Sequence, residues 1–246
     1  MTAHFKVKPI ILDSAALNET RKVYVCVPEK YASQNLPVMY LLDGGLKEHF
    51  PFIAEMADRL IATKVISPFI LVGIENINRN YDFTNNTQVA KDKKWVPKYG
   101  NAKNFKKFIS TELIPKINAE FNTNKKATVV GESLGGLLVL DLFFTEPNAF
   151  THYIAIDPSL WWNNQELFNQ CIVPFNFALL EDKTLWISAS KTMAIAKITH
   201  EMAAILAQNE RFKQNWFYQQ DTEQNHFTIF KASIEKALIW TFGVTT

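Results

Sequence analysis

The sequence has few cysteines, little net charge and no long apolar run. Only Cys26 and Cys171 occur among its 246 residues, and neither belongs to a C-x-x-C pair or a histidine-rich cluster, so we expect reduced thiols and no metal site. The formal net charge of +2 gives no global field that would favour nucleic acid or a membrane as partner. No apolar run approaches the roughly 20 residues of a membrane-spanning helix. Residues 1–12 lack the features of a secretory signal, which favours a cytoplasmic protein.

The pattern of apolar residues predicts an α/β fold in one domain, residues 1–246. With 48% hydrophobic residues the chain can bury one substantial core. Strand-like runs are found at residues 5–11, 22–27, 37–42, 69–74, 127–130, 152–156, 184–189 and 215–219. Helix-like runs are found at residues 48–63, 104–120, 136–145, 194–208 and 228–242. This alternation predicts an eight-stranded, mostly parallel sheet with helices on both faces and functional loops at the carboxyl ends of the strands.

A glycine-flanked serine follows the fifth strand-like run. Gly131-Glu132-Ser133-Leu134-Gly135 lies between an apolar strand and an apolar helix, which is the context of a nucleophile elbow. On so sharp a turn, side chains at Gly131 and Gly135 are expected to collide with the strand or the helix. A G-x-S-x-G match also occurs by chance in glycine-rich turns. Its position between strand and helix favours Ser133 as a nucleophile.

One histidine is suitably placed to activate Ser133. In this architecture the base follows the serine, in the loop after the last strand. His4 and His49 precede Ser133, His152 begins a strand at the remote end of the sheet, and His200 lies inside a helix. His226 follows the last strand-like run, and we predict that it is the base.

Two backbone N–H groups are candidates for an oxyanion hole, which stabilises the negative charge that develops during acyl transfer. Leu134 directly follows the predicted nucleophile and supplies one. The other is expected in the loop after the third strand, where Asp43-Gly44-Gly45 lets the backbone approach a ligand. We predict that Gly45 is the second donor.

Four stretches resemble a known family. The chain is similar to the α/β-hydrolase fold and, within it, to the putative-esterase family, which includes siderophore trilactone esterases, S-formylglutathione hydrolases and mycolyltransferases. The resemblance covers nearly the whole chain and rests on residues 37–44, 78–84, 131–136 and 158–162. Ser159-Leu160-Trp161-Trp162 resembles the siderophore-esterase branch most narrowly. The resemblance implies ester hydrolysis without a cofactor, and it agrees with the assignment of Gly45.

The third member of a catalytic triad is not evident. Hydrolases of this fold usually carry an acid after the seventh strand, and here Lys191-Thr192-Met193 stands in that place. Three readings remain open. In the first, Asp157 follows the sixth strand and would preserve the order Ser, Asp, His. In the second, Glu223 could orient His226 locally. In the third, a Ser/His dyad works without an acid, as the resemblance to siderophore esterases implies.

Several residues are candidates for substrate contacts. Trp161 and Trp162 follow the sixth strand and could wall an acyl or aromatic pocket, or pack in the core. Arg79 could bind a substrate carboxylate or phenolate, or pair with Asp82. It lies in residues 76–101, a polar segment expected to form an irregular loop. Seven lysines between residues 91 and 107 form a solvated surface or weakly favour an anionic substrate.

The sequence therefore predicts a serine esterase acting on a small-molecule ester, either a siderophore-type lactone or a short-chain or aromatic ester. An acyltransferase or a thioesterase could use the same residues. A binding protein of the same fold that has lost catalysis is the alternative of a different class.

Overall fold

The computed structural model describes residues 6–172, 180, 182–209, 212 and 214–244. His4, the expected start of the first strand at Phe5, and the side chain of Cys171 lie outside the described residues.

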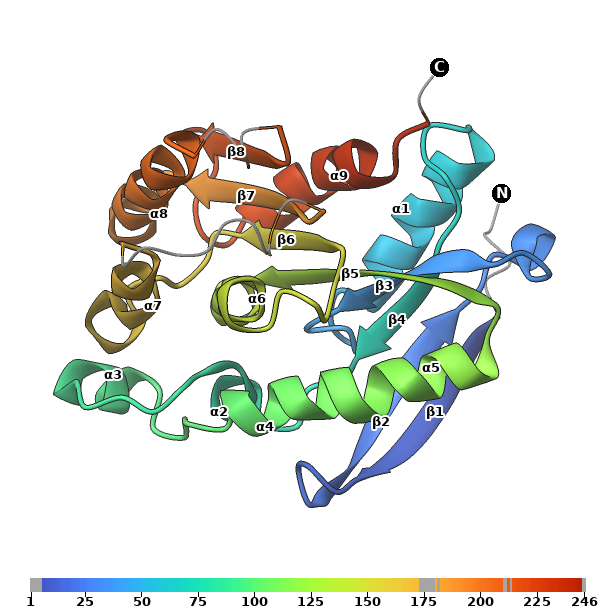
Figure 1. The fold of residues 1–246 in the computed structure, drawn as a ribbon, viewed down its shortest axis with the longest axis horizontal. Helices are drawn as coiled ribbons and strands as arrows, with labels where there is room; N and C mark the ends of the chain where they lie inside the picture. The colour runs from blue at the N-terminus through green and yellow to red at the C-terminus, as the bar shows by residue number, and fades with distance from the viewer. Residues whose placement is uncertain (1–5, 173–179, 181, 210–211, 213, 245–246) are drawn as a thin grey trace.

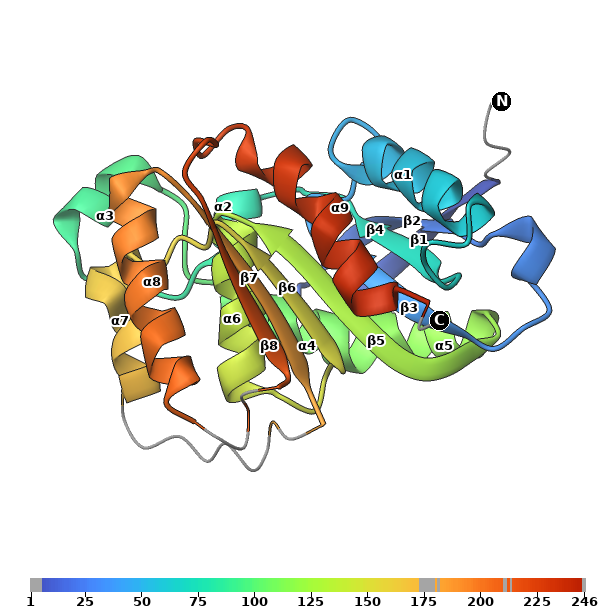
Figure 2. The same ribbon diagram turned by 90° about the horizontal axis from the view of Figure 1, so that it is seen from above.

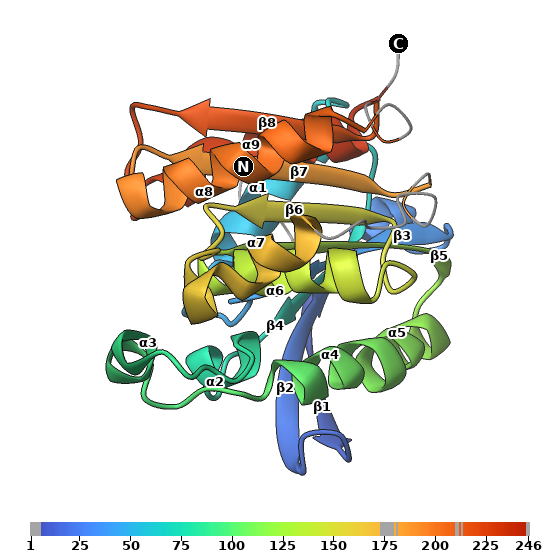
Figure 3. The ribbon, with the colours of Figure 1, turned by 60° about the vertical axis from the view of Figure 1, so that its left-hand side comes forward.

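An eight-stranded sheet forms the centre of the protein, as the sequence predicts. Its order is β1-β2-β4-β3-β5-β6-β7-β8. β2 pairs antiparallel with β1 and β4, and the remaining neighbours are parallel (Figure 3). The strands are β1 Val7–Ser14, β2 Glu19–Cys26, β3 Leu36–Leu41, β4 Ile70–Ile74, β5 Thr123–Glu132, β6 His152–Ile156, β7 Thr184–Ser190 and β8 Trp216–Asp221.

Helices cover both faces of the sheet (Figure 2). α1 (Phe50–Ala62) and α9 (Ile229–Phe242) lie on one face, where their buried apolar side chains pack with those of the strands. The other face carries α4 (Ala102–Lys107), the π-helical η2 (Phe108–Leu113), α5 (Ile114–Glu120), α6 (Leu134–Thr145) and α8 (Met193–Ala207). The short 3₁₀ helix η1 (Glu29–Tyr31) precedes β3. The two layers of helices together bury the apolar side chains on both faces of the central sheet, as an α/β layer architecture requires.

Three further helices lie at the carboxyl ends of the parallel strands. α2 (Arg79–Phe83), α3 (Ala90–Trp95) and α7 (Trp162–Ile172) occupy the side of the molecule toward which β5 and β7 point in Figure 1. The prediction of an irregular loop over residues 76–101 was wrong in part, because this segment contains α2 and α3. α7 was not predicted; its residues Asn163, Asn164 and Gln165 have left-handed backbone angles.

Within the described residues, none of the helices combines the length and apolar character needed to span a membrane.

Candidate active site

Ser133 stands at the turn between β5 and α6, as the elbow motif predicts. Its backbone angles are φ 58° and ψ −117°, a region that residues other than glycine rarely adopt. The turn is held because the Ser133 N–H donates to Ile156 O at 3.0 Å. A Cβ atom on Gly131 would lie 2.4 Å from Gly135 O, so only glycine fits there. The expectation for Gly135 was wrong, since a Cβ atom at that position would meet its nearest neighbour at an ordinary 3.5 Å.

A continuous chain of hydrogen bonds joins Asp157, His226 and Ser133. His226 Nδ1 lies 2.6 Å from Asp157 Oδ2, and Nε2 lies 3.0 Å from Ser133 Oγ. An ionised carboxylate only accepts hydrogen bonds, so Nδ1 carries the proton and Nε2 presents its lone pair to the serine hydroxyl. This is the arrangement in which a histidine can take a proton from a nucleophile.

Asp157 directly follows β6 and is held in place by Ser190, the last residue of β7. Its side chain is fully buried, and its backbone is left-handed with φ 48°. Oδ1 accepts from the Ser190 N–H at 2.7 Å and Oδ2 accepts from Ser190 Oγ at 3.0 Å. Of the three readings left open by the sequence, this geometry favours Asp157. Glu223 is exposed, and its backbone N–H donates to Asp221 Oδ1 at 3.1 Å.

The environment of His226 favours its protonated form. The hydrogen bond to Asp157 raises the pKa of His226 above its usual 6.5, and burial only partly opposes this effect. The nearby charge of Asp157 acts in the same direction. An imidazole of raised pKa accepts a proton more readily from Ser133.

Further polar groups, which were not predicted as site residues, hold these side chains. The His226 N–H donates to Thr192 Oγ1 at 3.2 Å, which ties the loop after β8 to the loop after β7. Ser159 Oγ lies 3.2 Å from Ser133 Oγ, and the Ser159 N–H donates to Ser133 O at 3.0 Å. Only Ser159, within the motif at residues 158–162, had any signal in the sequence.

The two predicted oxyanion donors differ in what they contact. Leu134 is the first residue of α6, where N–H groups have no partner within the helix. The Gly45 N–H donates to Glu48 Oε2 at 2.6 Å. Gly44 holds this loop against β4, since a Cβ atom there would lie 2.5 Å from the Gly73 Cα.

Arg79 is bound to the loop that contains Gly45. Its Nε and Nη2 donate to the two carboxylate oxygens of Asp43 at 2.5 and 2.9 Å, and Nη2 also donates to Glu132 O at 3.1 Å. The alternative of an Arg79–Asp82 ion pair was wrong, because Asp82 pairs with the buried Arg21 at 2.8 Å. Binding of a substrate by Arg79 stays a prediction.

The two predicted tryptophans differ in burial, so core packing suits one of them and substrate contact suits the other. Trp162 is 3% exposed, and its indole N–H donates to Asn85 O at 3.0 Å, which places it in the core beneath the loop before α3. Trp161 is partly buried and packs edge-on against Trp162, with ring centroids 5.9 Å apart. Of the two, Trp161 is the one with surface left to meet a substrate.

The lysine-rich segment is not uniformly solvated. Lys106 is buried and donates to Asp141 Oδ1 at 2.9 Å and Thr145 Oγ1 at 2.8 Å. Its charge therefore stabilises the packing of α4 on α6. Lys91, Lys94, Lys98, Lys103 and Lys107 are exposed.

Across the residues that the structure describes, His, Cys, Asp and Glu form no group of three or more that could hold a metal ion.

Comparison with known proteins finds a family and several relatives that match most of the chain. The sequence matches the family described as "Putative esterase" over residues 14–241. It is 33% identical over 172 residues to the ferri-bacillibactin esterase BesA of Bacillus subtilis, covering 62% of this chain and 58% of that protein. It is 31% identical over 173 residues to the siderophore triacetylfusarinine C esterase of Aspergillus fumigatus, covering 65% of this chain and 55% of that protein. The chain thus spans less than two thirds of both relatives.

Solved structures share the whole fold. The BES protein from Bacillus cereus superposes with a TM-score of 0.84 and 26% identity, covering 99% of this chain and 98% of that one. An IroE-like serine hydrolase from Shewanella oneidensis superposes with a TM-score of 0.83 and 24% identity, covering 96% and 80%. The fold is that of the α/β-hydrolases.

Proposed function

Because the chain belongs to the "Putative esterase" family, we propose that it hydrolyses carboxylic esters through an acyl-enzyme formed on Ser133. The observation that carries this proposal is the unbroken hydrogen-bonded chain from Asp157 through His226 to Ser133. Fold alone does not fix function, whereas a nucleophile, a base and an orienting acid within bonding distance define a reaction class.

Each group then has a role in the mechanism. Ser133 Oγ attacks the ester carbonyl while His226 Nε2 takes its proton, and the alkoxide that leaves receives that proton from His226. Asp157 keeps the Nδ1 proton in place and stabilises the imidazolium. The N–H groups of Leu134 and Gly45 stabilise the oxyanion. Water then attacks the acyl-enzyme by the same route in reverse and releases the acid.

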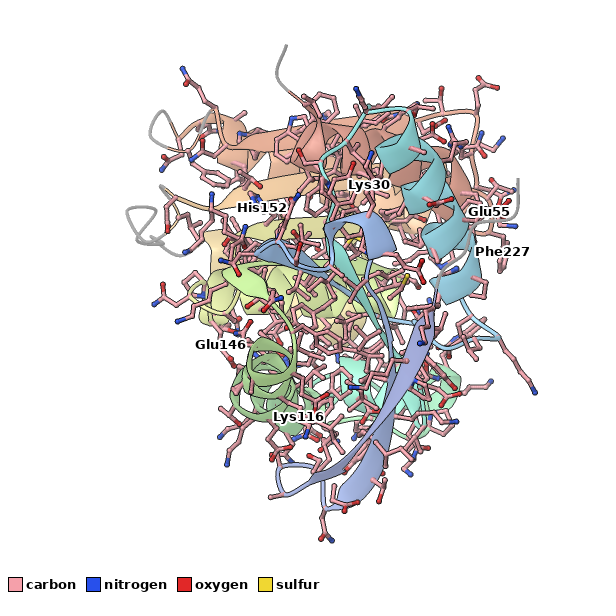
Figure 4. The ribbon with its side chains drawn as sticks, turned by 90° about the vertical axis from the view of Figure 1, so that its right-hand side faces the viewer. Lys30, Glu55, Lys116, Glu146, His152 and Phe227 are labelled. Atoms are coloured by element: carbon pink, nitrogen blue, oxygen red, sulfur yellow. The ribbon has the colours of Figure 1, made fainter. Side chains whose placement is uncertain are left out.

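The substrate that we propose carries bulky apolar or aromatic groups, with a siderophore-type lactone as the specific candidate. Two relatives in sequence are named siderophore esterases. Phe227, next to His226, is 92% exposed, and Figure 4 shows it at the edge of the molecule. Met193, next to Thr192, is 82% exposed. Because both side chains neighbour residues of the proposed site in the sequence, we propose that they contact the substrate.

Hydrolysis of p-nitrophenyl esters of increasing acyl length tests the reaction. Wild type is expected to release p-nitrophenolate, and Ser133→Ala is expected to release none above the background rate. Hydrolysis that persists in Ser133→Ala would contradict the proposal.

Substitution of Phe227 tests the substrate class. Phe227→Ala is expected to lower kcat/KM for p-nitrophenyl benzoate by about 5- to 30-fold, since burial of an aromatic ring contributes on the order of 1–2 kcal/mol. Its kcat/KM for p-nitrophenyl acetate is expected to stay unchanged. Ile11→Ala, which removes another exposed apolar side chain on β1, serves as control. Equal effects on both esters would contradict a role in specificity.

We also propose a cytoplasmic location. Cys26 is a buried free thiol, and burial raises its pKa to about 12, so it stays protonated and unreactive. A free thiol is typical of a reducing compartment. Cell fractionation is expected to recover the protein with cytoplasmic markers, and recovery from the medium would contradict this location.

A further inference from the structure

The backbone N–H assigned to the oxyanion hole already has an anionic partner within the chain. Gly45 is buried, and its N–H donates to Glu48 Oε2 at 2.6 Å. The Glu48 N–H donates back to Gly45 O at 3.0 Å, so the two residues close a tight turn. The other carboxylate oxygen, Oε1, accepts from Asn76 Nδ2 at 2.7 Å.

A carboxylate oxygen in this place has the charge and the acceptor geometry of an oxyanion. An N–H group makes one strong hydrogen bond, and bonds to an ionised acceptor are shorter and about twice as strong as bonds to a neutral one. A neutral ester carbonyl is therefore a weaker partner for Gly45 than Glu48 is. It cannot use this donor until Glu48 moves away.

We propose that Glu48 occupies the oxyanion hole in the resting enzyme and that substrate must displace its carboxylate from Gly45 before Ser133 attacks. This inference rests on the proposed function. It adds Glu48 as a residue that limits the rate of ester hydrolysis. Binding energy from remote parts of a large substrate would offset the cost of displacement, which favours such substrates over small esters.

The surroundings of Glu48 allow this movement. Its side chain is partly exposed, so the released carboxylate can be solvated. Asn76 Nδ2 also donates to Asp43 Oδ1 at 2.6 Å, and this bond remains when Glu48 leaves. Asp43 is in turn held by Arg79, so the loop that presents Gly45 keeps its position.

Glu48→Gln tests the proposal, with Glu75→Gln as matched control. The Glu75 Cγ lies 3.1 Å from the place of a Cβ atom on Gly45, but the Glu75 carboxylate faces Tyr24 and Lys22. The control thus removes the same charge nearby without changing the partner of the Gly45 N–H. We expect kcat/KM for p-nitrophenyl acetate to rise about 5- to 10-fold in Glu48→Gln and to change less than about 2-fold in Glu75→Gln.

Phenylboronic acid gives a second readout that a merely structural role would not change. Ser133 Oγ forms a bond to boron, the hydroxyl proton passes to His226, and the resulting anionic tetrahedral boronate places an oxygen in the oxyanion hole. Its inhibition constant is expected to fall about 5- to 10-fold in Glu48→Gln. Glu48→Ala, which removes the side-chain acceptor altogether, is expected to act in the same direction and replaces Glu48→Gln if that variant does not fold.

Unchanged boronate affinity in the folded variants, or a loss of activity in Glu48→Gln, would overturn the inference. An equal gain of kcat/KM in Glu75→Gln would also overturn it, because the effect would then come from charge alone. A different result is expected if the proposed function itself is wrong. In that case neither wild type nor any variant shows hydrolysis or boronate binding that depends on Ser133.

Discussion

At the scale of single residues, the bond between Asp157 and His226 determines which nitrogen of the imidazole faces the nucleophile. An asparagine at position 157 can donate to Nδ1 and so favour the tautomer that carries its proton on Nε2. We predict that Asp157→Asn lowers kcat by about 10²- to 10⁴-fold with little change in KM. Steady-state kinetics on a p-nitrophenyl ester measure this loss.

Glu223→Gln is the matched control for Asp157→Asn, since it neutralises the other acid near His226 in the sequence. It is expected to keep the wild-type rate. Near-full turnover in Asp157→Asn would remove Asp157 from the mechanism, and a selective loss in Glu223→Gln would assign the role to Glu223.

The raised pKa of His226 predicts a pH dependence of activity. His226 must be neutral to accept the proton of Ser133, so kcat/KM falls as the pH drops through the pKa of His226 in the free enzyme. The hydrogen bond to Asp157 raises this pKa, which places the midpoint of the acid limb above 6.5. In Asp157→Asn the residual activity is expected to show a lower midpoint. A wild-type midpoint at or below 6.5 would disagree with the observed geometry.

The sequence predicts site residues best where the signal is local. Ser133, Leu134 and His226 follow from a motif and from chain order. Asp157 remained one of three readings because its contact with His226 spans 69 positions and depends on how two loops meet. The sequence does not predict that Glu48 is the hydrogen-bond partner of Gly45. A contact between a side chain and the backbone of the same turn produces no periodic pattern.

At the scale of elements, the turn between β5 and α6 depends on one of its two flanking glycines. A Cβ atom on Gly131 would overlap Gly135 O at 2.4 Å, whereas one on Gly135 meets its nearest neighbour at 3.5 Å. We predict that Gly131→Ala lowers the free energy of unfolding by about 1–3 kcal/mol, as overpacked sites do. Urea denaturation followed by circular dichroism measures this change.

Gly135→Ala provides the matched comparison on the same turn. Alanine favours the helical backbone relative to glycine by up to about 1 kcal/mol, so this variant is expected to be neutral or slightly more stable. Equal destabilisation by both substitutions would refute the steric argument.

Most long elements with regular apolar spacing were predicted, whereas the short helices α2 and α3 were missed for a physical reason. α2 has five residues and α3 has six, too few to form without tertiary contacts. Asp82 of α2 pairs with Arg21 on β2, and Asp92 of α3 accepts from the Asn163 N–H at 2.7 Å. Such distant partners stabilise these helices and cannot be read from local spacing.

At the scale of the whole molecule, both layers of helices share one sheet. The apolar clusters on its two faces draw on alternate residues of the same strands, such as Val38 and Met39 on β3. We predict that the chain is a single domain with one cooperative unfolding transition. Circular dichroism and tryptophan fluorescence are expected to give the same midpoint in urea, and two separated transitions would indicate separate folding units.

Trapping the covalent intermediate shows whether Ser133 forms the acyl-enzyme. Wild type and Ser133→Ala are mixed with a p-nitrophenyl ester, quenched in acid within the first turnover and analysed by peptide mass spectrometry. The proposed mechanism predicts the mass of the acyl group on the wild-type peptide that contains Ser133 and no acylated peptide in Ser133→Ala. Wild-type hydrolysis without an adduct on Ser133, or with an adduct on another residue, would contradict it.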